Sequence, residues 1–216
     1  MWVQFLVEEE SMKVALDILL PKIVGEDKIG TSLRCDVRFF QGKKDLLQKL
    51  PSILKAYQNW LKSIQGVECR CVVVLDEDRS DCKVQKQELE QIARVANLIT
   101  KSAAGGNNQY QVMNRIVVEE LEAWFFGDVE ALAAAYPRIP ANLAAKKGYR
   151  NPDAIRGGTW EALERVLQKA GYHKAGLSKV KAAIDITPYM LPERNRSRSF
   201  QVFREGLLEL VQRLVA

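Results

Sequence analysis

The chain has 216 residues, enough for one domain or for one domain with a helical extension. Its composition, 47% hydrophobic and 27% charged, is that of an ordinary globular protein. The longest apolar stretches cover about five to seven residues, far short of the roughly 20 that a membrane-spanning helix needs. A signal-peptide pattern is absent at the start, so we expect a cytoplasmic protein with no membrane partner.

The cysteines and the histidine exclude several kinds of site. Four cysteines at irregular spacing do not form a disulfide framework or a zinc-finger pattern. Cys69 and Cys71 alternate within a predicted strand, so both should be structural thiols on one face. The only histidine, His173, excludes a histidine-rich metal cluster and makes a serine or cysteine triad improbable. We expect it to be an exposed polar residue.

The net charge of +5 is unevenly distributed. Residues 1–136 are close to balanced, whereas residues 137–216 carry most of the basic excess. A basic segment in a protein that also holds an acidic site suits an enzyme acting on a polyanion, although a basic surface also serves solubility. Composition therefore favours nucleic acid, DNA or RNA, or another phosphate-bearing partner.

Predicted strands and helices alternate over the first 136 residues. The second strand alternates apolar and charged residues, so it should be an edge or half-exposed strand. Helical periodicity in the first helix stops near Pro21, and Pro51 predicts a break or a fresh start within the second helix. We expect strands at about 2–7, 34–40, 69–75 and 111–118, and helices at about 11–21, 43–64, 80–100, 119–126 and 128–136.

The strand signal disappears after Pro137. Prolines then separate short helical pieces that we expect at about 141–146, 159–170, 176–185 and 197–214. The pattern predicts an α/β domain over residues 1–136, with a mainly parallel sheet of about four strands in a three-layer sandwich. Residues 137–216 are expected to form a C-terminal helical extension packed on it.

Three of the predicted strands end abruptly in carboxylates. Short apolar, β-branched runs are typical of strands buried on both faces of a parallel sheet. These runs end at Glu8–Glu10, at Asp76–Asp78 and at Glu119–Glu122. Ligands of such sheets bind beyond the carboxyl ends of the strands, and clustered carboxylates repel one another unless they share a cation. Hard oxygen ligands in this arrangement indicate a Mg²⁺ or Mn²⁺ site.

The spacing of the acids suggests a role for each. Asp76 and Asp78, at i and i+2, can face one ligand from a single loop. Glu8 lies nearest its strand end and is the candidate for a metal ligand or a base. Glu119 and Glu122, at i and i+3, are candidates for a second metal position. The alternative is that acids at helix starts only cap the helix and favour its dipole.

Candidate phosphate-binding cations lie near the same strand ends and at the start of the last helix. Lys43 follows a glycine after the second strand, and Arg79 follows the acidic triplet. No P-loop pattern accompanies Lys43. Arg196 and Arg198 lie in a polar segment that opens the last helix, which is either a phosphate-binding helix start or a capped, solvated loop.

Five motifs extend along the sequence: FLVEE at 5–9, GKKDL at 42–46, VLDEDR at 74–79, VEELEAWF at 118–125 and NRSRSFQ at 195–201. Over nearly the whole chain, these motifs resemble the bacterial DUF4276 family. On a shorter stretch, residues 1–136, a strand-terminal Glu8 and an Asp76-x-Asp78 pair on a four-strand α/β pattern resemble the Toprim domain. That domain occurs in topoisomerases, primases and overcoming-lysogenization-defect nucleases.

The Toprim resemblance implies a Toprim-like sandwich and a Mg²⁺ ion held by Asp76 and Asp78. It implies that Glu8 is a ligand or a general acid/base. Many Toprim proteins have glycine after this glutamate, whereas Glu9 stands here, which leaves the geometry of the first loop open. Toprim relatives of this size resemble nuclease subunits of bacterial anti-phage systems that are encoded beside an ATPase. An ATPase partner is therefore implied by the resemblance alone.

We accordingly expect a Mg²⁺-dependent phosphodiesterase, a nuclease. The alternative is a non-catalytic Toprim-like module that binds nucleic acid or a partner protein. A phosphatase of the haloacid-dehalogenase kind also has an Asp-x-Asp after an apolar strand, but that family has Thr or Val where Ser80 stands here. The sequence does not fix the substrate, and it leaves open whether the chain forms a homo-oligomer.

Overall fold

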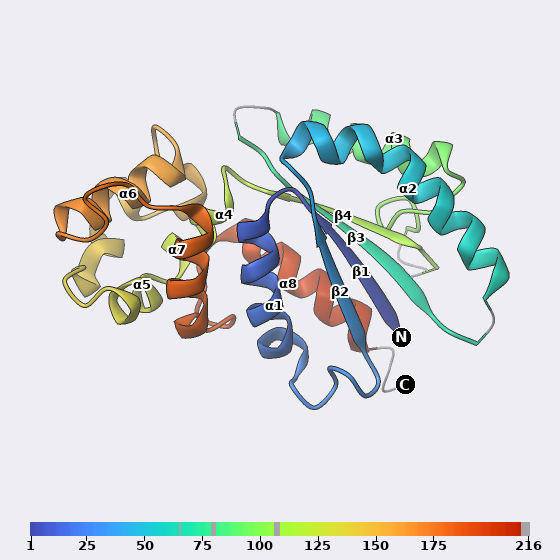
Figure 1. Ribbon diagram of the computed structural model, residues 1–216, viewed down its shortest axis with the longest axis horizontal. Coiled ribbons are helices and arrows are strands. Elements are labelled where there is room, and N and C mark those ends of the chain that lie inside the picture. Colours follow the sequence, from blue (N-terminus) through green and yellow to red (C-terminus); the bar gives the residue numbers. More distant parts are fainter. Residues whose placement is uncertain (65, 79–80, 106–108, 213–216) are drawn as a thin grey trace. The chain divides into compact units, whose positions relative to one another are not determined.

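The computed structural model describes residues 1–64, 66–78, 81–105 and 109–212 (Figure 1). Contacts group the chain into two compact units. The first contains residues 1–10 and 27–116, and the second contains residues 11–26 and 117–216. Each unit is described by itself. The division at residue 136 remains a prediction, because these units are groups of contacts and not tested folding domains.

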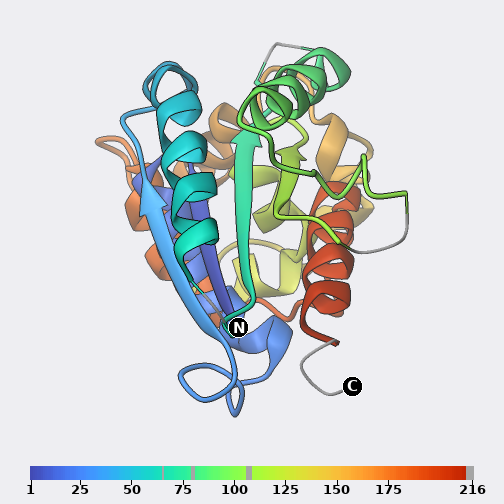
Figure 2. The same cartoon turned by 90° about the vertical axis from the view of Figure 1, so that its right-hand side faces the viewer.

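The first unit is built on a four-stranded sheet with the order β2-β1-β3-β4. β1 pairs in parallel with β2 on one side and with β3 on the other. Figure 2 shows β2 and β3 with their arrowheads at the same end. This confirms the expected α/β class with a parallel sheet of about four strands. The strands are β1 (Trp2–Val7), β2 (Arg34–Phe39), β3 (Cys69–Asp76) and β4 (Val112–Val117).

The position of each strand follows from its side chains. β3 has only one residue that is not buried, as expected for a continuous apolar run in the middle of a parallel sheet. In β2 the charged residues Arg34, Asp36 and Arg38 alternate with apolar ones, and none of its residues is fully buried. The prediction of an edge strand is confirmed, because β2 lies at one end of the strand order.

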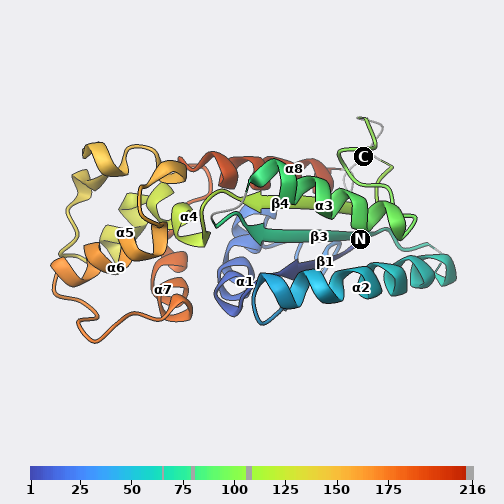
Figure 3. The same ribbon diagram turned by 90° about the horizontal axis from the view of Figure 1, so that it is seen from above.

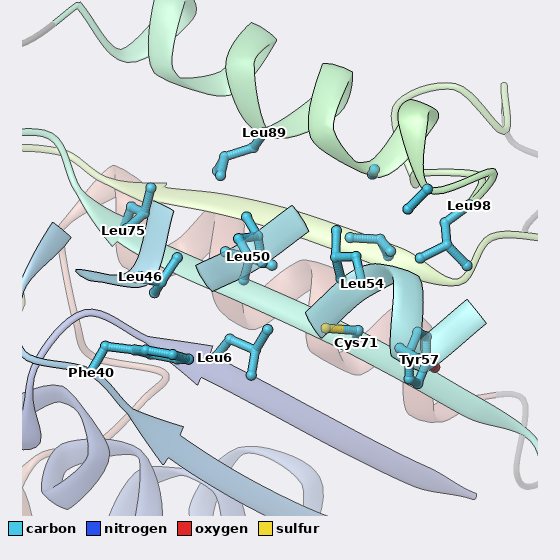
Figure 4. Packing of buried hydrophobic residues seen from close by; sticks show 14 of the residues in the cluster. Leu6, Phe40, Leu46, Leu50, Leu54, Tyr57, Cys71, Leu75, Leu89 and Leu98 are labelled. Carbon is cyan, nitrogen blue, oxygen red and sulfur yellow. The ribbon is translucent and has the colours of Figure 1, made fainter. Parts of the chain in front are cut away.

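Helices α2 (Lys43–Ser63) and α3 (Cys82–Val95) lie on the same face of the sheet (Figures 1 and 3). Leu46, Leu50 and Leu54 form one stripe of α2 and are fully buried. They pack in a cluster with Leu6 and other side chains of the sheet and with α3 (Figure 4). Cys69 and Cys71 belong to the same cluster, and both are free thiols, as expected.

The second unit is helical, and its described residues after Val117 form no strand. It contains α1 except for its first residue. The α-helices are α1 (Glu10–Val24), α4 (Leu121–Gly127), α5 (Val129–Ala135), α6 (Thr159–Lys169), α7 (Lys179–Ile186) and α8 (Arg198–Val211). The described residues of this unit also form the 3-10 helices η1 (Ala141–Ala145), η2 (Lys147–Tyr149) and η3 (Pro152–Ala154) between α5 and α6, and η4 (Thr187–Tyr189) between α7 and α8.

Both predictions from prolines inside helices are wrong. α1 continues past Pro21 to Val24, and the Pro21 carbonyl still accepts a hydrogen bond from the Gly25 N–H at 2.9 Å. α2 runs unbroken through Pro51. A proline inside a helix costs about 3 kcal/mol, and buried apolar side chains before and after it offset that cost. α3 is shorter than predicted because the chain turns after Val95.

No described helix is both long and apolar enough to span a bilayer.

The leucine stripe of α2 gives a direct test of this packing. Leu50→Ala removes a fully buried side chain from the cluster, and we expect it to lower the free energy of unfolding by about 2–5 kcal/mol. Val95→Ala, at a position that is 69% exposed, should cost less than about 0.5 kcal/mol. Chemical denaturation of both variants checks this, and equal losses would contradict the packing described.

Candidate functional site

The carboxyl ends of β1 and β3 bring two acidic segments together within the first unit. In the parallel register, Val7 of β1 is level with Val74 of β3. The residues just beyond are therefore neighbours. The Asp76 backbone N–H donates to Glu8 Oε2 at 3.3 Å. Both residues are buried, each with an exposed fraction of 7%. Strand ends 68 residues apart in sequence thus meet at one edge of the sheet.

The turn after β2 adds a cation to this edge. Val7 is level with Phe39 of β2, and the Gly42 N–H donates to the Glu8 carbonyl at 3.1 Å. Gly42 has φ 94°, a left-handed conformation that glycine adopts without strain. Lys43 then begins α2. Its Nζ lies 2.5 Å from Asp78 Oδ2 and 3.3 Å from the Glu77 carbonyl oxygen.

Glu8, Lys43 and Asp78 interact electrostatically. Burial raises the pKa of the Glu8 carboxyl to about 7, from an ordinary value of 4.5. The Lys43 ammonium acts in the opposite direction and lowers this pKa, whereas the Asp78 carboxylate raises it further. Glu8 is therefore a buried acid whose charge depends on the two groups beside it.

Two acids near β3 stabilise the start of α3. The Cys82 N–H donates to Glu77 Oε1 at 3.3 Å. Asp81 is the N-cap, and its Oδ1 accepts from the N–H groups of Lys83 and Val84 at 2.7 and 3.3 Å. The capping alternative thus describes Glu77 and Asp81. Asp78 differs from them, because it adopts φ 53° and directs its carboxylate to Lys43.

The remaining predicted site residues are not among the described residues of the first unit. Arg79, and Ser80 on which the comparison with phosphatases rested, lie outside the described residues. Glu119 and Glu122 belong to the second unit, where Glu122 is fully buried and Glu119 has φ 64°. Their role as ligands of a second metal stays a prediction.

The start of α8 already holds a carboxylate. Asp153 accepts hydrogen bonds from the backbone N–H groups of Arg198 and Ser199, at 2.5 and 3.2 Å, and from the Ser197 hydroxyl at 2.6 Å. A helix N-terminus attracts an anion, and Asp153 supplies one from within the second unit. Arg196 and Arg198 are exposed, and phosphate binding by their side chains stays a prediction.

The comparisons with known proteins identify the family. The family model described as a domain of unknown function, DUF4276, matches residues 7–208. The chain belongs to the DUF4276 family. This confirms the resemblance drawn from the five motifs, whereas the link to Toprim domains stays a prediction. Searches of curated proteins and of solved structures found no match.

The donor set of this DUF4276 protein suits a magnesium ion better than a closed metal site. Among the described residues, no group of three or more histidine, cysteine, aspartate or glutamate side chains is placed to hold a metal. Mg²⁺ does not require one, since it is usually bound by one or two carboxylates together with water and substrate phosphates. Glu8, Asp76 and Asp78 carry carboxyl oxygens of this kind at the ends of β1 and β3, and their role as metal ligands stays a prediction.

The expectation that His173 is exposed in this DUF4276 chain is also wrong. His173 is half-buried rather than exposed, and its Nε2 lies 3.1 Å from the Tyr136 hydroxyl. That hydroxyl donates to Asp185 Oδ2 at 2.7 Å.

Sequence reasoning also missed that Lys43 is the counter-ion of Asp78. Sequence spacing carries no signal for either contact, because both join residues more than 30 positions apart.

The raised pKa of Glu8 predicts a pH-dependent stability. The folded state holds a proton on Glu8 up to about pH 7, whereas the unfolded chain releases it near pH 4.5. Stability from this group is therefore complete below pH 4.5 and is lost as the pH rises through about 7, by roughly 3 kcal/mol. Glu8→Gln should flatten that decline. Denaturation with a chelator present measures it.

Glu10→Gln is the matched control for this prediction, because Glu10 is an exposed acid at the start of α1. It retains Glu8 and is expected to retain the wild-type profile. A wild-type stability that stays level between pH 4.5 and 7 would contradict the burial of an ionisable Glu8.

Proposed function

We propose that this DUF4276 protein is a Mg²⁺-dependent, Toprim-like phosphodiesterase that cleaves nucleic acid. The observation that supports it is the set of first-unit residues Glu8, Asp76, Asp78 and Lys43 gathered at the carboxyl ends of β1 and β3. Carboxylates and one ammonium group at such an edge are the groups that phosphoryl chemistry uses.

The order of the strands supports this location. In an open parallel sheet, ligands bind outside the carboxyl ends of the strands, where the chain leaves in opposite directions from neighbouring strands. In the order β2-β1-β3-β4, this switch point lies between β1 and β3. Glu8 follows β1 and Asp76 ends β3. The acids therefore occupy the position where a parallel sheet places its ligand.

Each residue has a distinct role in the proposed reaction. Asp76 and Asp78 hold the metal, with Glu8 as a further ligand or as the base. A bound Mg²⁺ supplies charge that polarises the scissile phosphate and lowers the pKa of water. A carboxyl with a pKa of about 7 exchanges a proton readily at neutral pH, which suits Glu8 to accept one from the attacking water. Lys43 offsets the charge on a phosphate oxygen.

The proposal extends to the setting in which the enzyme acts. The basic excess after residue 136 favours a nucleic-acid substrate, DNA or RNA. The Toprim resemblance adds an ATPase partner and a role in anti-phage defence within the cytoplasm. Composition supports the substrate class, and the resemblance supports the partner and the setting. The chemistry itself is supported by the acidic edge, by which we mean Glu8, Asp76 and Asp78 at the carboxyl ends of β1 and β3.

A second candidate is favoured by the ion pair between Lys43 and Asp78. An ammonium group 2.5 Å from a carboxylate neutralises it without any metal. On this reading the edge is a stable internal salt bridge, and the protein is a non-catalytic module that binds nucleic acid or a partner. The two candidates differ in whether divalent metal binds at Asp76 and Asp78.

The double variant Asp76→Asn/Asp78→Asn tests the first candidate. We expect it to abolish the heat of Mg²⁺ and Mn²⁺ binding in isothermal titration and to lower metal-dependent cleavage of DNA or RNA by at least about 100-fold. Asp81→Asn is the matched control, since it removes one nearby charge and leaves an equally good N-cap. Unchanged cleavage in the double variant would reject the assignment, and absence of metal binding in the wild type would favour the second candidate.

Lys43→Met tests whether lysine and metal compete for Asp78. Removing the ammonium leaves Asp78 without its cation, so Mg²⁺ should bind several-fold more tightly while the KM for nucleic acid rises. Lys44→Met, an exposed residue in the same helical turn, should change neither quantity. Titration calorimetry and steady-state kinetics measure the two effects, and weaker Mg²⁺ binding in Lys43→Met would show that the lysine does not compete with the metal.

A further inference from the structure

A basic pocket lies within the second unit. It has a volume of about 570 Å³ and is formed by the segment 147–156 and by one residue of α6. Four of its lining side chains are cationic, and none is acidic. They are Lys147, Arg150, Arg156 and Arg165. We call these four residues and the space between them the basic pocket.

The charge of the basic pocket is not neutralised from within the described part of the chain. All four cations are exposed, and none forms an ion pair with a described carboxylate. The only acid in residues 141–158, Asp153, accepts hydrogen bonds from the start of α8. The Glu161 carboxylate lies against Gly158, 2.0 Å from where a Cβ would be, at the start of α6. It is therefore directed toward the helix terminus.

The wall of the basic pocket is held in place before any ligand binds. Arg150 Nε donates to the Ala145 carbonyl at 3.0 Å, which fixes its guanidinium. Asn151 Oδ1 accepts from the Asp153 N–H at 3.1 Å, which leaves its amide group to donate. The Tyr149 ring stacks on Phe126, with centroids 5.4 Å apart. Less conformational entropy is lost on binding when such groups are already ordered.

We propose that the basic pocket binds closely spaced phosphate groups, such as neighbouring phosphodiesters of a nucleic-acid strand. Four cations around one pocket need a ligand that carries several negative charges within a short distance. Three of the four are arginines, whose planar guanidinium matches phosphate oxygens in pairs. The inference deepens the proposed function, on which it rests for the nature of the ligand, by naming where that ligand is held.

The volume of the basic pocket limits the size of the ligand that it can hold. Pockets of about 300–1,000 Å³ enclose a small molecule, so the basic pocket is large enough for two phosphate groups and the sugar between them. A strand of nucleic acid and a free oligophosphate share this chemistry. Competition with tripolyphosphate separates these two sources.

The test is binding of a fluorescent single-stranded oligonucleotide, followed by anisotropy with a chelator present. Arg156→Gln/Arg165→Gln should lower the affinity at least about tenfold at moderate salt. It should also reduce the slope of log affinity against log salt by roughly 1.4, since each phosphate contact on a single strand contributes about 0.7. Both positions are exposed, so the melting temperature should stay close to that of the wild type.

A matched control separates the basic pocket from bulk charge. Lys169→Gln/Lys174→Gln removes the same two charges from exposed positions of the second unit that do not line the pocket. It should bind the oligonucleotide within about twofold of wild type. Equal losses in the two double variants would overturn the proposal, as would wild-type affinity in the pocket variant. Arg156→Lys/Arg165→Lys, which retains the charge, should recover most of the salt dependence.

Competition identifies the source of the phosphates. If tripolyphosphate binds the wild type, binds the pocket variant more weakly, and the oligonucleotide does not bind, the ligand of the pocket is a free oligophosphate. Oligonucleotide binding that tripolyphosphate displaces only weakly assigns it to a strand. Binding with a chelator does not depend on hydrolysis, so loss of cleavage in the aspartate variant with intact oligonucleotide binding would separate the two proposals.

Discussion

The parallel pairing of β1 with both of its neighbours is the constraint on which the acidic edge depends. Because β1 runs in register with β2 and β3, the residues that follow each strand emerge at one edge. The Gly42 N–H then donates to the Glu8 carbonyl at 3.1 Å, and the Asp76 N–H donates to the Glu8 carboxylate at 3.3 Å. An antiparallel partner would place its terminal acid at the opposite edge, and the site would not exist.

The electrostatics of this edge follow from its burial. A carboxylate loses solvation when it is buried, and the loss is large unless a cation or a proton compensates for it. The raised pKa of Glu8 favours the protonated, uncharged carboxyl, and the Lys43 ammonium favours the charged form. Lys43 also pairs with Asp78. A single ammonium group thus serves two acids. A divalent cation would serve them better, and this imbalance is the physical reason for the proposed metal.

The two units offer two kinds of charge for phosphate chemistry. The first presents the buried acids Glu8 and Asp76 at the end of its sheet, together with Lys43 and the more exposed Asp78. The second presents exposed arginines whose neighbouring acids are used to cap helices, as Asp153 does for α8. The positive charge of these arginines therefore stays on the surface, while Asp153 accepts hydrogen bonds from the N–H groups at the start of α8. The proposed phosphodiesterase would use both kinds of charge: acids for a metal, and cations for the strand.

Sequence by itself determined the strands, the parallel α/β class, the DUF4276 family and the strand-end acids, because each of these depends on local apolar runs and on motifs of a few residues. Tertiary structure alone decided which acids meet a partner. Glu77 and Asp81 resemble Asp78 in sequence, yet they stabilise α3, whereas Asp78 contacts Lys43 from 35 residues away. Likewise, Pro21 and Pro51 indicated interruptions of their helices. Both helices continue past these prolines, because apolar side chains on either side of each proline are buried. Contacts between distant residues depend on register and packing, which no local pattern encodes.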